Sequence, residues 1–380
     1  MKVGIITYFH FYNYGTMLQA YALERICANF GKGIDCEIID YRFGEKTKWR
    51  KWDRLIIRIK RSFVYVKEFK RVKTTYSYKN RMNRRRKFFD DFLSEHFRLS
   101  PVKYFYKEEL TVNPPCYDIY ITGSDQTWSP KIGFNSALFL DFAPREARKA
   151  AYAPSVGVTS FTREEEEYLR EHLERYDYLS CRETTGARLL ADLVKKEVNV
   201  VLDPTLMITG DEWRKLAIAP NLTRPYILCY FLGERQYYRE FVQRLKAKTG
   251  YDVYFLPVSW VDCKHQNHLL FDAGPAEFIG LIDHAAVVCT DSFHGMCFSI
   301  NLEKFFYGFV KHKGAVDGGD NSRIYDLLQR TGLTSRLLSD DVLEQEWNVE
   351  DIDYEFVNQQ LDNERRRSAS YLNKVLYDYD

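Results

Sequence analysis

The sequence has eight cysteines, but no two of them form a Cys-x-x-Cys pair. No cysteine pair stands with histidines at the spacing that zinc ligands show. Scattered thiols of this kind are typical of reduced, mostly buried residues in a cytoplasmic protein. The sequence therefore predicts neither a disulfide framework nor a metal site.

Long apolar runs are also missing. After Met1 and Lys2, only six residues, 3–8, precede the polar His10. No later run approaches the ~20 apolar residues that a membrane-spanning helix needs. These absences predict neither a signal peptide nor a spanning helix, and they favour a protein that stays in the cytoplasm.

A Gly-x-Gly-x-x-Gly loop is the third missing pattern. Residues 3–8 and 36–41 have the apolar character of strands, and Leu18, Ala22 and Ile26 recur between them at helical spacing. This opening predicts a βαβ unit of Rossmann character. Because the glycine loop that binds a dinucleotide is missing, no dinucleotide cofactor is expected.

Length and composition indicate two domains. The 380 residues exceed an ordinary single domain, and 45% hydrophobic residues with 16% aromatics allow two cores. Strand and helix patterns alternate in both halves, with a Pro- and Asn-containing boundary near residues 211–224. We predict an α/β protein with Rossmann-like domains at 1–210 and 222–335. A helix within 350–380 is expected to pack across both.

Three polar turns follow predicted strands in the first half. They lie at residues 13–15, 123–126 and 182–183. The carboxyl ends of parallel strands meet at one edge of a sheet, and ligands of open α/β sheets bind beyond that edge. We therefore predict that these turns converge where a substrate lies. For the first turn, a simple chain reversal is the alternative.

The run from residue 286 to residue 300 predicts a strand, a polar turn and the start of a helix. Asp291 and Ser292 are typical helix N-caps, and Gly295 removes a side chain where a ligand can approach the backbone. Free N–H groups at a helix start attract anions. The turn predicts an anion pocket that contains His294; the alternative is a packed or capping histidine.

One segment of the chain is strongly basic. Residues 46–87 contain 18 Lys and Arg against two acids, Asp53 and Glu68. Residues 49–69 carry apolar side chains three or four apart, which predicts an amphipathic helix. We interpret residues 45–105 as a helical insert that binds an anionic membrane surface. Nucleic acid is the rival partner, and a face packed on its own domain is the structural alternative.

A second unusual segment is polar and rich in glycine. It spans residues 311–323 and follows a predicted strand at 304–309. Such a composition predicts a mobile loop, here over the cleft between the two domains.

Five short motifs give the chain a family resemblance. They are Asn13-Tyr14-Gly15, Gly-Ser-Asp-Gln-x-Trp at 123–128, Ser-x-Arg-Glu at 180–183, Asp203-Pro204-Thr205, and Thr-Asp-Ser-Phe-His-Gly at 290–295. With these motifs in this order, the chain resembles the polysaccharide pyruvyl transferase family. The resemblance implies transfer of a pyruvyl group from phosphoenolpyruvate onto two hydroxyls of a sugar, with release of phosphate. It also implies two Rossmann-like domains facing a central cleft, as in B-type glycosyltransferases, with the acceptor side in the first and the donor side in the second.

The chain departs from the family at one important position. Members with an Arg-Leu-His triplet bind phosphoenolpyruvate partly through that arginine, whereas Ser292-Phe293-His294 stand there in this chain. His294 carries over and the arginine does not. The missing charge is expected from Arg323, Lys304, Lys311 or Lys313.

Residue roles follow from the chemistry that the resemblance implies. Each step of ketal formation moves a proton, and a histidine titrates near neutral pH, so His294 is the expected general acid and base. Arg182 is expected to grip the anionic donor with its fork of N–H groups, the alternative being a structural salt bridge. The expected donor-binding residues are Arg182, Ser292, Phe293, His294, Gly295 and Arg323. The expected acceptor-binding residues are Asn13, Tyr14, Gly15, Ser124, Asp125 and Gln126.

The expected partners are phosphoenolpyruvate, a lipid-linked sugar of a cell-envelope or capsular polysaccharide, and an anionic membrane surface contacted through residues 46–87. That combination predicts a peripheral location on the inner face of the cytoplasmic membrane. No cofactor, metal or nucleic acid is expected, and a homo-oligomer is compatible with the sequence. Two other functions stay open: a sugar-nucleotide-dependent glycosyltransferase, and a non-catalytic membrane-associated scaffold of polysaccharide assembly.

Overall fold

The computed structural model describes residues 1–43, 75–258, 268–311, 321–343 and 350–378. Within them the first half forms a five-stranded parallel sheet in the order β3-β2-β1-β4-β5. The strands are β1 (Lys2–Ile6), β2 (Asp35–Tyr41), β3 (Leu99–Tyr104), β4 (Ile119–Thr122) and β5 (Arg148–Ala151). β1 lies between β2 and β4 and is buried over Val3 to Ile6, which explains its nearly continuous apolar sequence.

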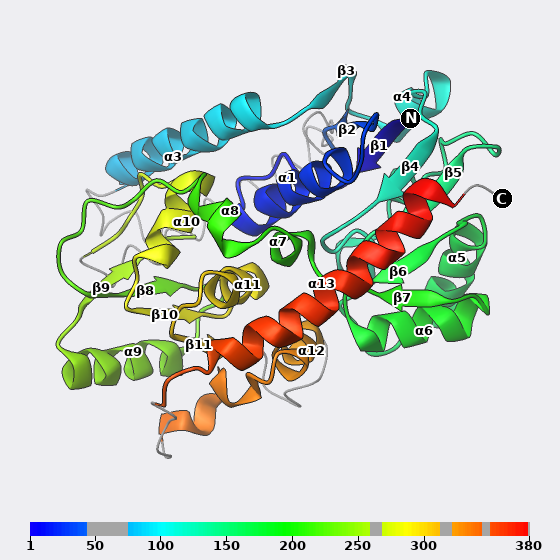
Figure 1. Cartoon of the computed structure of the whole chain (residues 1–380). Coiled ribbons are helices and arrows are strands. Elements are labelled where there is room, and N and C mark those ends of the chain that lie inside the picture. The colour runs from blue at the N-terminus through cyan, green and yellow to red at the C-terminus, as the bar shows by residue number, and fades with distance from the viewer. Residues whose placement is uncertain (44–74, 259–267, 312–320, 344–349, 379–380) are drawn as a thin grey trace.

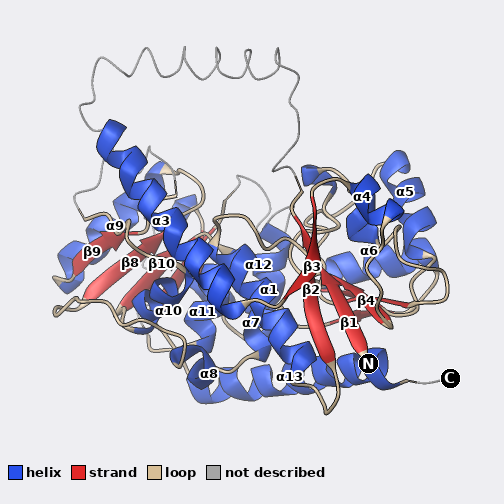
Figure 2. Cartoon of the chain, turned by 90° about the horizontal axis from the view of Figure 1, so that it is seen from above, coloured by secondary structure: helices blue, strands red, loops and turns tan. Residues whose placement is uncertain are grey.

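Helices cover both faces of this sheet. Figure 2 shows α1 (Tyr14–Ala28) and α13 (Tyr354–Tyr377) on one face, with α5 (Arg163–Leu173) and α6 (Thr184–Val194) on the other. Side chains alternate along β1, so Ile5 and Ile6 belong to the two different cores on those faces.

The second half repeats this design. Its sheet has the order β12-β11-β10-β8-β9, again all parallel. The strands are β8 (Tyr226–Tyr230), β9 (Asp252–Phe255), β10 (Val287–Thr290), β11 (Phe306–Phe309) and β12 (Leu337–Leu338), and the helices are α9 (Gln236–Thr249), α10 (Pro275–Asp283), α11 (Phe293–Asn301) and α12 (Ser322–Arg330). β12 lies beyond the predicted domain end at residue 335, and the domain boundaries themselves stay a prediction.

The strand that carries Arg182 belongs to a small separate sheet. β6 (Leu179–Cys181) pairs in parallel with β7 (Val198–Val200), and one isolated bridge between Ala150 and Tyr178 links this pair to the first sheet. The expectation that all three turns follow strands of one sheet is therefore corrected: the third turn follows an extension of it. The extension still runs parallel to β5 and brings Arg182 to the same edge.

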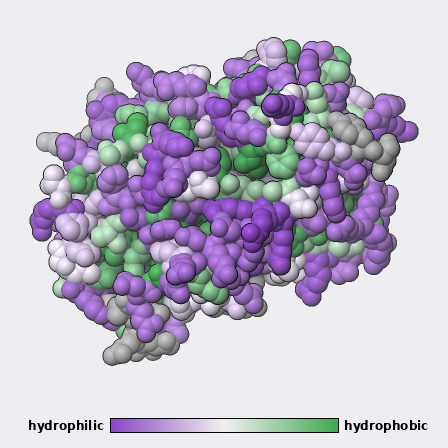
Figure 3. Space-filling model, viewed as in Figure 1, coloured by the Kyte–Doolittle hydropathy of each residue, from purple (hydrophilic) through white to green (hydrophobic). Residues whose placement is uncertain are grey.

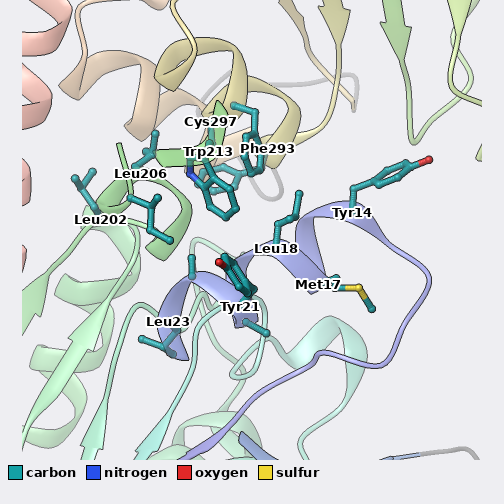
Figure 4. Packing of buried hydrophobic residues seen from close by; sticks show 14 of the residues in the cluster. Tyr14, Met17, Leu18, Tyr21, Leu23, Leu202, Leu206, Trp213, Phe293 and Cys297 are labelled. Carbon is teal, nitrogen blue, oxygen red and sulfur yellow. The ribbon is translucent and has the colours of Figure 1, made fainter. Parts of the chain in front are cut away.

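The largest core joins the two halves. α1 packs through Leu18 and Tyr21 against Leu206 of α7 (Pro204–Met207) and Trp213 of α8 (Gly210–Arg214), as Figure 4 shows. The rings of Tyr21 and Trp213 lie 5.8 Å apart. The ring of Trp213 also lies 5.0 Å from that of Phe298 in α11 of the second half. Burial of these apolar side chains therefore joins the two halves.

α13 strengthens this junction. Figure 1 shows it running from the second half to the first. Tyr354 at its start donates to the carbonyl of Lys304 (2.5 Å), Arg365 donates to the carbonyl of Leu206 (2.8 Å), and Tyr371 donates to the carbonyl of Ala151 (2.7 Å). In the same view the surface over α13 is mostly hydrophilic (Figure 3). α13 thus contacts residues of both halves.

The described part of the basic insert packs on the second half. α3 (Thr75–His96) places Arg85 in a buried position, where it donates to the carbonyls of Pro257 and Leu270. Arg84 lies 3.4 Å from the Asp272 carboxylate. This part is therefore packed, but on the second half and not on its own domain as the structural alternative had it. The apolar stripe at 49–69 lies outside the described residues.

The remaining described elements are α4 (Lys107–Val112) and the 3-10 helices η1 (Pro130–Ile132), η2 (Ser136–Phe139), η5 (Thr334–Arg336) and η6 (Asp340–Leu343). Across the described part of the chain, no helix is long and apolar enough to cross a membrane.

Candidate active site

The predicted strand, turn and helix at residues 286–300 are β10 and α11. Ser292 is the N-cap of α11, and its hydroxyl accepts from the backbone N–H of Gly295 (3.3 Å). The Thr290 hydroxyl accepts from the Ser292 N–H (3.0 Å), and a Cβ on Gly295 would lie 2.5 Å from that hydroxyl. This tight turn makes His294 the second residue of the helix, beyond the end of β10.

Asp291 does not cap α11. Its carboxylate is buried and accepts from the N–H groups of Leu232 (2.6 Å) and Gly233 (2.9 Å). It therefore fixes the loop between β8 and α9. This loop lies at the same edge of the sheet as His294. Burial raises the pKa of Asp291, against the lowering effects of Lys311 and of these two N–H groups.

Two buried residues of the first half meet near His294. Arg182 directly follows β6, and Asp203 is the N-cap of α7; their exposed fractions are 3% and 1%. Asp203 Oδ1 accepts from the N–H (3.0 Å) and the hydroxyl (2.7 Å) of Thr205. Asp203 Oδ2 accepts from Nη1 of Arg182 (2.7 Å). Thr205 thus fixes the carboxylate and directs its second oxygen at the arginine.

His294 completes this cluster. Its Nε2 lies 3.4 Å from Oδ2 of Asp203, which is an ion-pair distance, although the contact does not have hydrogen-bond geometry. Burial alone would raise the pKa of Asp203, but His294 and Arg182 lower it more strongly, so the net pKa is well below its usual range. Asp203 is therefore an anion that both of the predicted catalytic residues share.

Arg182 keeps one edge of its guanidinium group unused. Among the described residues, Nε and Nη2 have no hydrogen-bond partner although both atoms are buried. Burial acts to lower the pKa of Arg182, but Asp203, Asp125 and Glu183 raise it, so the group stays charged. The ring of Phe293 lies 4.1 Å from the guanidinium carbon. A buried cation with two free donors on one edge can take a carboxylate or a phosphate in a two-pronged contact.

The first turn of α1 lies against His294. A Cβ built on Gly15 would be 2.1 Å from Nδ1 of the imidazole, so only glycine permits this approach. Asn13 caps the helix by accepting from the Thr16 N–H (3.1 Å), and the Thr16 hydroxyl donates to Asp125 (2.9 Å). The turns at 13–15 and 123–126 therefore meet beside the histidine.

Other predicted acceptor residues have structural contacts of their own. The hydroxyl of Tyr14 donates to the Ala273 carbonyl (2.8 Å), and its ring stacks on Phe278 at 4.5 Å. Ser124 is buried and donates to Gln19 (2.6 Å), whereas Gln126 is half-buried. Binding of a sugar by these residues stays a prediction.

The candidate replacement cations lie in different places. Lys304 precedes β11, at the edge of the sheet opposite to His294, and its ammonium group donates to the Asp283 carbonyl (2.6 Å). Arg323 is buried in the first turn of α12, and Lys311 follows β11 at the edge where His294 lies. Lys313 lies outside the described residues. Arg323 and Lys311 therefore remain the better placed candidates among those described.

α12 also approaches the Arg182 turn. Arg330 donates to the carbonyl of Arg182 (3.3 Å), and Asp326 accepts from the N–H of Thr184 (3.1 Å). Glu183, which lies between Arg182 and Thr184 in sequence, is buried and accepts from the N–H groups of Val156 (2.9 Å) and Gly157 (3.1 Å). The backbone around Arg182 is thus held by both halves.

Sequence reasoning missed Asp203 as a site residue. The signal was present, because Asp203-Pro204-Thr205 is one of the family motifs and Asp before Pro is a common helix start. Without the structure, that pattern could not be distinguished from an ordinary cap that only stabilises α7.

Solved structures that resemble the whole chain define its fold class. A putative UDP-N-acetylglucosamine 2-epimerase from Listeria monocytogenes is 11% identical, with a TM-score of 0.54 over 100% of this chain and 97% of that one. The UDP-GlcNAc 2-epimerase from Methanocaldococcus jannaschii in complex with UDP-GlcNAc and UDP is 15% identical, with a TM-score of 0.51 over 96% and 93%. The predicted α/β class with the two-sheet architecture of B-type glycosyltransferases is confirmed.

The family follows from the sequence match. The model of the polysaccharide pyruvyl transferase family matches residues 13–310, a range that contains all five motifs. The chain belongs to the polysaccharide pyruvyl transferase family, and its activity is that of a transferase. No curated protein matches the chain.

The contact between Gly15 and His294 gives a first prediction. In Gly15→Ala the added Cβ must push the imidazole away, and a misplacement of ~1 Å at a catalytic group can lower turnover ~100-fold. We expect that loss with a nearly unchanged melting temperature, measured by an activity assay and calorimetry. Gly31→Ala, which meets only the flexible end of Tyr377, is the control. Wild-type turnover in Gly15→Ala would show that the imidazole position does not matter.

Proposed function

We propose that the protein transfers a pyruvyl group from phosphoenolpyruvate to two hydroxyls of one sugar in a polysaccharide precursor. The product is a cyclic pyruvate ketal, and inorganic phosphate is released. Membership of the polysaccharide pyruvyl transferase family supports this reaction. The observation that carries it in the structure is the buried free edge of Arg182 beside His294.

The donor and Arg182 are matched in charge and shape. Phosphoenolpyruvate has a carboxylate and a phosphate, and each offers two oxygens at the spacing of a guanidinium edge. Nη1 of Arg182 is already bound to Asp203, so Nε and Nη2 form that edge. A ligand oxygen there would supply the partners that these two buried N–H groups lack.

The proton balance of the reaction suits one histidine. One sugar hydroxyl adds to the central carbon of the enol, and a proton joins the methylene carbon to make a methyl group. The second hydroxyl then displaces phosphate, and its proton leaves with the phosphate. His294 alternately accepts a hydroxyl proton and donates a proton, which is general acid–base catalysis. No cofactor or metal is needed in this scheme.

Removal of the imidazole tests this proposal. His294→Gln keeps a polar side chain but cannot exchange a proton, so phosphate release with phosphoenolpyruvate and acceptor should fall ~100- to 10,000-fold. The matched control is His284→Gln, an exposed histidine at the end of α10. A rate within tenfold of wild type in His294→Gln would exclude the proposed role.

The location of the acceptor suggests attachment at a membrane. We propose that the sugar is carried by a lipid on the inner face of the cytoplasmic membrane, and that the basic segment 46–87 binds the anionic surface there. Arg84 and Arg85 of α3 have protein partners, so the attraction must come mainly from the rest of the segment. Each lysine or arginine near such a surface contributes on the order of 1 kcal/mol.

Sedimentation with liposomes tests membrane binding. We expect the protein to sediment with anionic but not with neutral vesicles, and salt to weaken binding because the Debye length is only ~8 Å at physiological ionic strength. Trp49→Ala combined with Trp52→Ala should reduce binding even at low salt. The control is Phe356→Ala, an exposed aromatic on α13. If the wild-type protein does not sediment with anionic vesicles at low salt, a soluble acceptor is the better proposal.

A further inference from the structure

We infer that Asp203 is a positioning residue that fixes the tautomer of His294, so that Nδ1 is the nitrogen that exchanges protons with the substrate. The tautomer follows from contacts in the structure, and the catalytic part of the inference rests on the proposed function.

The two oxygens of Asp203 have different neighbours. Oδ1 receives two donors from Thr205, its N–H and its hydroxyl. Oδ2 receives Nη1 of Arg182 and faces Nε2 of His294 at 3.4 Å. Because a backbone N–H can only donate, the Thr205 contact fixes which oxygen faces which side of the site. Asp203 cannot turn without losing these bonds.

This arrangement selects a proton on Nε2. An anionic oxygen 3.4 Å from a neutral imidazole is attractive only if the facing nitrogen carries the hydrogen. The contact is longer than an ordinary hydrogen bond, and catalytic contacts of this kind often shorten only when substrate binds. With its single proton on Nε2, the neutral ring has its lone pair on Nδ1.

The surroundings of Nδ1 agree with this assignment. Nδ1 lies beside Gly15 in the first turn of α1, a 15-residue helix whose start carries a partial positive charge. A lone pair is favoured there over an N–H. The same turn contains Asn13, and it touches Asp125 through Thr16, so Nδ1 faces the residues predicted to hold the acceptor sugar.

In catalysis the two ring nitrogens of His294 therefore have different roles. When a sugar hydroxyl gives its proton to Nδ1, the ring becomes a cation whose Nε2 lies 3.4 Å from Oδ2 of the Asp203 anion. Asp203 stabilises that cation and keeps its own charge throughout. Arg182, held by the same Oδ2, remains aligned with its free edge toward the donor.

One isosteric substitution reverses the tautomer. In Asp203→Asn the N–H of Thr205 still requires an oxygen, so the amide NH2 group must take the place of Oδ2. That NH2 group donates to Nε2, which then has to be the unprotonated nitrogen, and the proton moves to Nδ1. It also brings N–H donors against Nη1 of Arg182. The variant keeps the volume of the side chain but presents His294 with the wrong tautomer.

Nitrogen NMR of the full-length protein, with 15N-labelled histidine, tests the inference without any substrate. The signal of His294 is assigned by its loss in His294→Gln. At a pH where the ring is neutral, we expect protonated Nε2 and unprotonated Nδ1 in wild type, and the reverse in Asp203→Asn. Asp283→Asn, which breaks a similar pair with Arg214, should leave the His294 signals unchanged. A protonated Nδ1 in the wild type overturns the inference.

Kinetics then separates this inference from the proposed function. We expect Asp203→Asn to lower kcat for phosphate release ~100-fold or more, and Asp203→Glu, which keeps the charge, to recover part of that loss. If wild type releases no phosphate from phosphoenolpyruvate with any acceptor, the proposed function fails while the NMR result still decides the tautomer. If Asp203→Asn reverses the tautomer but keeps the wild-type kcat, Nδ1 is not the reacting nitrogen.

Discussion

The shared carboxylate of Asp203 is the interaction on which the site depends. It lies at the start of α7 and joins Arg182 from the first half to His294 from the second. The Arg182 cation could not be buried without it, because an uncompensated charge in a protein interior costs several kcal/mol. Its low pKa, produced by His294 and Arg182 against the opposing effect of burial, keeps it ionised down to acidic pH.

A carboxyl group whose folded pKa is depressed stabilises the protein at all pH values above its unfolded pKa of ~3.9, and this stabilisation is lost as the pH falls further. The contact between the two halves at Asp203 therefore involves a charge that is fully present at neutral pH. The packing of α1 against α7 and α8, with α13 across both halves, holds the three residues at this spacing.

Most of the fold could be predicted from the sequence. Apolar strands followed by polar turns and amphipathic helices identified both parallel sheets, and α13 (Tyr354–Tyr377) lies within the range 350–380. β3 was missed because residues 99–104 have exposed and half-buried positions among the buried ones, with little apolar periodicity. The packing of α3 on the second half could not be read from a local pattern, because Arg85 binds carbonyls about 170 and 185 residues away.

The sequence indicated several residues of the candidate site but not the contacts between them. Position at strand ends identified Arg182, His294 and the turn at 13–15, whereas the role of Asp203 depends on two long-range contacts. For Asp291 the sequence predicted a helix cap that the structure does not show. Its carboxylate instead accepts from the N–H groups of Leu232 and Gly233. Local sequence shows which residue types lie at an edge, and tertiary packing decides which of them meet.

A crystal structure of the protein with phosphoenolpyruvate tests the central claim most directly. We expect an oxygen pair of its carboxylate or phosphate to accept from Nε and Nη2 of Arg182, with the methylene carbon beside His294. Phosphoenolpyruvate bound without contact to Arg182, or a nucleotide sugar in that place while phosphoenolpyruvate fails to bind, would contradict the account.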